Sequence, residues 1–194
     1  MSQPPPLENP FWQFSLRVYT LPGVAECCLC LQDQFGLSVN LLLFAAWMAK
    51  LGQSLSVPEV AQALQAIAPL ETLATQPLRT LRRTMLKRLD LPTSWQQEWK
   101  QKLLAAELYA EQMQQAMLYQ WAQTQVWGQT PLKERGAAMS AIASVDRTTL
   151  LHTTLHSYIQ LVAAPPTPDL QATLQVFKDL LSQEFHSHDW NEIA

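Results

Sequence analysis

Hydrophobic residues recur every three to four positions along most of this chain, which is the period of a helix with one buried face. No segment sustains the strict alternation of a half-buried strand, and glycine and proline stand where helices would begin or end. The pattern therefore predicts an all-α fold, a single-domain bundle of about seven or eight helices. The predicted helices cover residues 10–20, 24–34, 38–51, 56–67, 69–89, 94–127, 147–162 and 169–185.

Three of the predicted helix ends carry capping residues. Asn9 can accept a hydrogen bond from the first turn of its helix, and Pro10 fits the first helical position because its missing N–H is not needed there. Gly36 can adopt the left-handed conformation that ends a helix. Ser56 and Glu59 have the spacing of a capping box. These residues fix where three helices begin or end.

Three predicted helices have unusual properties. Residues 38–51 are apolar around most of the helix circumference, so we expect this helix to be the central, buried one. The helix at 94–127 would be roughly 50 Å long at a rise of ~1.5 Å per residue, which exceeds the size of a small bundle. Pro77 is expected to interrupt or kink the helix at 69–89.

Proline-rich segments divide the chain. Residues 1–8 are predicted to be a flexible tail, and residues 9–163 to be the helical domain. The proline-rich segment 164–168 is expected to be a stiff linker to an amphipathic C-terminal helix at 169–185. Residues 186–194 are predicted to be a loose tail.

Composition narrows the possible classes of protein. Hydrophobic residues make up 48% of the 194 residues and charged residues 15%, which is enough for a real core. The net charge of −3 disfavours nucleic-acid binding over the whole surface. The N-terminus does not resemble a signal peptide, no apolar stretch is long enough to span a membrane, and the three cysteines are too close together for disulfide staples. We therefore expect a cytoplasmic protein with reduced thiols and no membrane association.

Two pairs of residues could bind a metal or carry redox chemistry. Cys27 and Cys30 have a redox spacing, but Cys27 falls inside a predicted helix, so both are interpreted as small buried hydrophobic residues. His152 and His156 lie one helical turn apart, as two metal ligands would, but the sequence indicates no third ligand. No phosphate-binding loop or nucleophile motif occurs. The sequence therefore predicts no metal, no cofactor and no catalytic residue.

A basic stripe is the first candidate binding surface. Spacings of three and four residues put four basic side chains on one helix face, and two tryptophans follow at the start of the long helix. The candidate residues are Arg79, Arg82, Arg83, Lys87, Trp95 and Trp99. Arginine and tryptophan are frequent in interaction hot spots, so we hypothesise a partner-binding surface here. The alternatives are a solvated face or internal pairing with the acidic residues of 165–194.

A polar patch is the second candidate. Asp33 falls in the last turn of its helix, where the negative end of the helix dipole disfavours a carboxylate. It is expected either to accept N–H groups near Ser38–Asn40 at the start of the next helix, as a structural lock, or to form a ligand-binding pocket. The residues of this possible polar pocket are Gln32, Asp33, Asn40 and Trp47.

The first fifty residues carry a resemblance to a known family. The motifs are FWxFSLxVY at residues 11–19, PGV at 22–24, CLxLQDxxG at 28–36 and VNLLLFxxW at 39–47. They resemble an uncharacterised family of short proteobacterial proteins, a domain of unknown function. Members of that family commonly have an acidic residue where this chain has Ser38. The resemblance implies a bacterial, cytoplasmic, helical protein and implies no activity or cofactor.

These observations lead to two hypotheses of function. The first is a non-enzymatic interaction or adaptor protein that binds an acidic protein or a ribonucleoprotein through the basic stripe; nucleic acid itself is a less favoured partner. The alternative is a small-ligand binder or enzyme with a pocket near Asp33, Asn40 and Trp47. Either protein would be a monomer or a homodimer.

Overall fold

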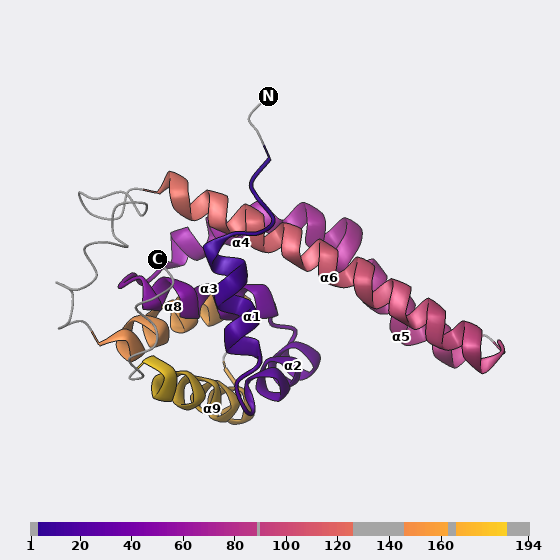
Figure 1. The fold of residues 1–194 in the computed structure, drawn as a ribbon. Helices are drawn as coiled ribbons and strands as arrows, with labels where there is room; N and C mark the ends of the chain where they lie inside the picture. Colours follow the sequence, from indigo (N-terminus) through magenta and orange to yellow (C-terminus); the bar gives the residue numbers. More distant parts are fainter. Residues whose placement is uncertain (1–3, 89, 126–145, 163–165, 186–194) are drawn as a thin grey trace.

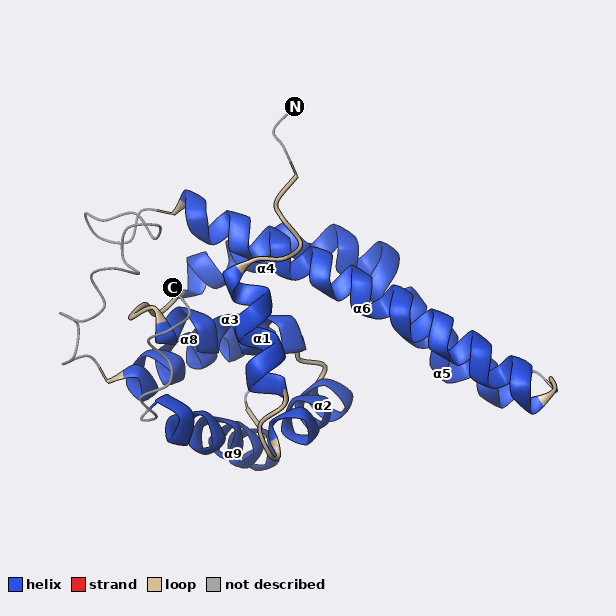
Figure 2. Cartoon of the chain, in the orientation of Figure 1, coloured by secondary structure: helices blue, strands red, loops and turns tan. Residues whose placement is uncertain are grey.

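The computed structural model describes residues 4–88, 90–125, 146–162 and 166–185. The predicted loose tail at 186–194 and part of the predicted linker lie outside the described residues. Every regular element that the structure describes is helical, which confirms the all-α prediction (Figure 2). The elements are α1 (Pro10–Tyr19), α2 (Val24–Phe35), α3 (Val39–Lys50), α4 (Val57–Leu70), the π-helical segment η1 (Glu71–Thr75), α5 (Gln76–Arg88), α6 (Thr93–Thr124), α8 (Arg147–Val162) and α9 (Pro168–Phe185).

The helices form a body and a projecting arm. Figure 1 shows α1, α2, α3, α8 and α9 gathered together, while α5 and α6 run antiparallel and extend away from them. The C-terminal half of α6 packs on the body with α4, whereas α5 packs mainly against α6 and η1. We call the antiparallel pair α5–α6 the arm.

The helix α3 is the centre of the body, as predicted. All of its residues from Asn40 to Lys50 are buried, and it contacts α1, α2, α6 and α8. The ring of Phe44 lies 5.3 Å from that of Phe11, edge to face, and Phe11 lies equally close to Trp47. Burying such apolar side chains is the main free-energy gain of folding.

The C-terminal helix α9 packs on the outside of the body, against α2. Its apolar face is buried, as the amphipathic pattern predicts, and is formed by Leu170, Leu174, Phe177 and Leu181. The helix packs against α2 and α8. The Cys27 thiol reaches the backbone carbonyl oxygen of Thr173 at 3.5 Å.

The predicted caps are present. The Asn9 side chain accepts a hydrogen bond from the backbone N–H of Trp12 at 3.0 Å. Gly36 ends α2 in the left-handed conformation, with φ of 70°. Ser56 and Glu59 form the capping box of α4. Local sequence therefore determines these boundaries.

The region around Pro69 and Pro77 differs from the prediction. The chain stays helical from α4 into α5, and Pro69 lies inside α4. The irregularity falls instead at η1, whose wider turn directly precedes Pro77. An ordinary α-helical turn would bring the Pro77 ring against the carbonyl of Leu73, and widening the helix relieves such a clash.

No single helix of the described residues is long and apolar enough to cross a membrane, although α1 and α2 together, bent by 99°, satisfy the same length and composition test.

Replacing Phe44 with alanine should lower the free energy of unfolding by about 3–5 kcal/mol, because the side chain is fully buried among aromatic rings. Val176 lies half-exposed on α9, so Val176→Ala should change it by less than about 0.5 kcal/mol. Urea denaturation of the two variants beside wild type measures both values. Equal effects of the two substitutions would contradict the placement of α3 at the centre.

Candidate functional site

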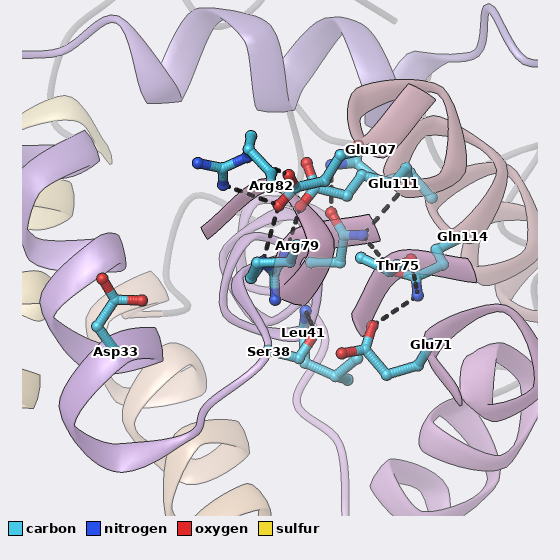
Figure 3. Close-up of polar contacts among 12 residues, drawn as sticks. Asp33, Ser38, Leu41, Glu71, Thr75, Arg79, Arg82, Glu107, Glu111 and Gln114 are labelled. Atoms are coloured by element: carbon cyan, nitrogen blue, oxygen red, sulfur yellow. Dashed lines mark hydrogen bonds and ion pairs between the residues drawn. The ribbon is translucent and has the colours of Figure 1, made fainter. Parts of the chain in front are cut away.

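Most of the candidate residues meet where the arm joins the body. Here α5 supplies arginines, α6 supplies carboxylates and amides, and α2 and α3 supply the facing polar residues (Figure 3). The predicted polar pocket and the base of the predicted basic stripe are thus parts of one region.

The arginines of the stripe are paired within the chain. Arg79 Nε lies 2.8 Å from Glu107 Oε1, and Arg79 Nη2 lies 2.7 Å from Glu111 Oε1. Arg82 Nε lies 2.8 Å from the other oxygen of Glu107. We call these four residues the ion-pair cluster. Internal pairing was one of the expected alternatives, but the acidic partners are on α6 and not at 165–194, because α5 runs antiparallel along α6 and brings one turn of each helix into register.

Burial and pairing shift the acidities within the ion-pair cluster. Burial acts to raise the pKa of Glu107, but the hydrogen bonds from Arg82 and Arg79 outweigh it and the net shift is downward. Burial raises the pKa of Glu111 despite the attraction of Arg79. Burial also works against the charge of Arg79, yet its contacts with Glu107 and Glu111 raise its pKa. Glu107 is therefore the carboxylate that the arginines stabilise most in its charged form.

A buried amide network adjoins the cluster. Asn40 Nδ2 donates to Gln114 Oε1 at 2.6 Å, and Asn40 Oδ1 accepts from Gln115 Nε2 at 2.9 Å. Gln114 Nε2 in turn donates to Glu71 Oε2 at 2.8 Å and to Thr75 Oγ1 at 3.1 Å. Asn40 thus uses both polar atoms to join α3 to α6, and its role is primarily structural.

The structural lock proposed for Asp33 is wrong. Its carboxylate does not accept N–H groups from the start of α3; the Ser38 side chain instead accepts from the Leu41 backbone N–H at 3.4 Å. Asp33 pairs with Arg83 across the gap between α2 and α5, and both side chains are 46% exposed. The local sequence around Asp33 could not predict this partner, because Arg83 lies fifty residues away.

Two cavities flank the junction of arm and body. The first has a volume of about 530 Å³, and its wall includes Gln32, Asp33 and Asn40. The second, of about 420 Å³, is mostly apolar. The two share a wall that includes Asn40, Arg79 and Glu111. Three of the four predicted pocket residues therefore surround a real cavity.

Trp47 does not belong to that pocket, contrary to prediction. Its side chain is buried, with ring centroids at 5.3 Å from Phe11 and 5.8 Å from Phe44 and Tyr119. It lines neither cavity. Trp47 is two turns from Asn40 along α3, about 10 Å at ~1.5 Å per residue, so the helix carries it into the aromatic core.

The structure separates the tryptophans from the arginines. Trp95 and Trp99 lie near the tip of the arm and are 64% and 47% exposed. They are about 18 and 12 Å from Glu107 along the helix axis, at ~1.5 Å per residue. The side chain of Lys87 lies outside the described residues. The predicted continuous surface of arginine and tryptophan is thus divided in two. The arginines at the base of the arm are in ion pairs, and the tryptophans near its tip are exposed to solvent.

The buried polar residues of α6 are not among the residues predicted from the sequence. Glu107 and Gln114 are buried on the same face as Leu103 and Ala110. The signal is visible in the sequence: polar residues stand at spacings of three and four within an otherwise apolar stripe. Buried polar groups need partners, so this pattern indicates a facing element with complementary groups.

The histidines and cysteines considered as metal or redox sites lie in ordinary packing environments. The rings of His152 and His156 stack at 6.4 Å, and a nitrogen of His156 lies 3.0 Å from Gln160 Nε2. Within the described ranges, no group of three or more histidine, cysteine, aspartate or glutamate side chains could hold a metal ion. Burial raises the pKa of Cys27 to about 11, and Cys28 beside it is fully buried.

Glu107→Gln should lower the free energy of unfolding by about 2 kcal/mol at neutral pH, because the amide keeps the shape but removes the carboxylate that two half-buried arginines share, and only Arg79 keeps a second one, Glu111. The matched control is Glu98→Gln, which removes an exposed ion pair with Lys102 and should change it by less than about 0.5 kcal/mol.

The same comparison has a pH dependence. The pKa of Glu107 is lowered in the folded state, so its contribution is present above the ordinary glutamate pKa and is lost as the pH falls through the folded value. The stability difference between wild type and Glu107→Gln should therefore be largest near neutral pH and shrink as the pH falls below the ordinary glutamate pKa of about 4.5. The charge of Glu107 contributes to the raised pKa of Glu111, so the same comparison is made in a Glu111→Gln background. A constant difference as the pH falls, from urea titrations, would contradict the pairing.

Comparison with known proteins gives a family. A family model described as "Protein of unknown function (DUF2390)" matches residues 10–118, from the start of α1 to within α6. No curated protein and no solved structure matches the chain. The matched segment contains α3, the ion-pair cluster and the arm up to residue 118, and the chain belongs to the DUF2390 family.

Proposed function

We propose that this protein is a non-enzymatic interaction protein that docks a protein partner on the tip of its α5–α6 arm. The observation that carries the proposal is the exposed aromatic face of α6. Trp95 and Trp99 lie one helical turn apart on one side of α6 near the tip, whereas Tyr109 lies at the base, between Glu107 and Glu111 in the sequence. About half or more of each side chain is exposed.

Aromatic side chains gain much from burial against a partner. Tryptophan and tyrosine bring large apolar areas with few rotatable bonds, and they dominate the energetics of many interfaces. A projecting pair of helices presents them away from the body, where a partner can approach without meeting α1 or α9 (Figure 1). This arrangement favours docking of a protein over a role in packing.

The charge of the arm favours an acidic partner. Between residues 76 and 124 basic residues outnumber acidic ones by seven to four, although the whole chain has a net charge of −3. Glu107 and Glu111 neutralise Arg79 and Arg82 at the base, so the excess lies toward the tip with residues such as Lys100. A partner with an apolar surface edged by carboxylates complements this tip. The pairing of the arginines disfavours a phosphate backbone as the ligand.

Photocrosslinking from the arm tests the proposal. A benzophenone amino acid in place of Trp99 in the full chain should give a covalent adduct in a lysate of the source cells, whereas the same residue in place of Val176 on α9 should not. Both positions are about half-exposed, 47% and 51%, so they are matched for access. Mass spectrometry of the adduct identifies the partner.

A second set of variants tests which chemistry holds the partner. Trp95→Gln with Lys100→Glu should abolish the Trp99 adduct, while Leu161→Gln with Val176→Gln, exposed apolar positions on the body, should leave it unchanged. Circular dichroism checks that all variants stay helical. An adduct that survives the first pair, or no adduct from Trp99 in wild type, would overturn the arm as the docking surface.

A further inference from the structure

The mostly apolar cavity of about 420 Å³ has a composition that the proposed function does not use. It lies between the α1–α2 corner and the flank of α6 opposite the exposed tryptophans. Five leucines line it: the buried Leu43 of α3 and four exposed ones, Leu16 of α1, Leu29 of α2, and Leu104 and Leu108 of α6. Its volume falls in the range of small-molecule sites.

The four leucines from α1, α2 and α6 are exposed to solvent although they line the same cavity. Each is between two-fifths and about half exposed, and together they are a third of the exposed large hydrophobic residues that the structure describes. Scattered exposed leucines are ordinary on a protein surface, but a converging set around a concavity is typical of a binding site. An apolar ligand body would remove this surface from water.

The wall of the cavity also holds two buried polar atoms without partners. Ser15 Oγ and Gln115 Oε1 make no hydrogen bond in the described part of the chain. Both residues line the cavity and both are nine-tenths or more buried. An unsatisfied buried polar atom costs free energy that a hydrogen-bonding group of a ligand can recover. The site is therefore not purely apolar.

One edge of the cavity is cationic. Three arginines and two glutamates line it, and Glu107 and Glu111 hold Arg79 and Arg82. In the part of the chain that the structure describes, Arg83 has one ion-pair partner, Asp33, which does not line this cavity, and the pair is exposed to solvent. Exposed ion pairs are weak, so an anion at the cavity can replace Asp33 at little cost.

We propose that this cavity binds an amphipathic monocarboxylate, with its apolar body among Leu16, Leu29, Leu104 and Leu108 and its carboxylate on Arg83 in place of Asp33. Arg83 can leave Asp33 and bind one negative charge of a ligand. Its planar guanidinium can donate two parallel hydrogen bonds to a carboxylate. Arg83 also lines the adjoining cavity, but none of these four leucines does, so only the mostly apolar cavity offers sites for both parts of the ligand.

Titration with decanoate, below the concentration at which it forms micelles, tests this proposal. Trp12 lines the cavity, so its fluorescence reports binding, and calorimetry gives the affinity. Decanol, the uncharged analogue, serves as the control ligand. Wild type should bind decanoate at least tenfold more tightly than decanol, since a charge-assisted hydrogen bond is gained only by the carboxylate.

Two substitutions should move the affinity in opposite directions. Arg83→Gln should weaken decanoate at least tenfold and leave decanol unchanged, whereas Asp33→Asn, which removes the competing carboxylate, should tighten decanoate about threefold. Leu108→Gln should weaken both ligands, and the matched exposed control Val176→Gln should weaken neither. Both charge variants change half-exposed side chains, so they should fold.

Three results would overturn the proposal: no binding of decanoate to wild type, equal affinity for decanoate and decanol, or weaker decanoate binding by Asp33→Asn. Competition by an added peptide, or a change of oligomeric state on titration, would identify a protein segment as the occupant and would also overturn it. The arm variants at Trp95 and Trp99 should bind decanoate normally, so this test is independent of the docking function.

Discussion

The helix α3 has no face toward solvent, and the arrangement of the other helices follows from that. An apolar helix gains free energy only if its whole circumference is covered, and one neighbour covers about one side. Four helices contact α3, and they come from both ends and the middle of the chain. The body is therefore built by bringing distant segments to one helix, and no part of it is a bundle in its own right.

The one buried side-chain amide of α3, that of Asn40, also determines how α6 and therefore the arm pack on this helix. Asn40 lies in an otherwise apolar helix, so its two polar atoms need partners, and Gln114 and Gln115 of α6 supply them. The contact sets the register of α6 on α3. The same register brings Glu107 and Glu111 opposite Arg79 and Arg82, since Glu107 lies two turns and Glu111 one turn before the glutamines. A single core residue thus fixes where the arm leaves the body.

What could be predicted from sequence is local. Asn9, Gly36 and Ser56 identify helix ends because a cap bonds to its own first or last turn. The burial of α3 and the apolar face of α9 follow from periodicity alone. The partners of Arg79 and Asp33, and the position of Trp47, depend on which helices lie side by side, and periodicity does not encode that. The predicted break before Pro69 is wrong because α4 continues to Leu70, and the predicted interruption at Pro77 takes the form of the π-helical segment η1 two residues before it.

The contact between α2 and α9 bears on how the chain reaches this structure. Cys27 and Thr173 are 146 positions apart, so α2 acquires its cover from α9 only after at least that many further residues have been made. During synthesis α2 emerges first with an uncovered apolar side, and loops this long close slowly. The body therefore closes only once α9 has left the ribosome, and until then α2 is a segment that would depend on a chaperone.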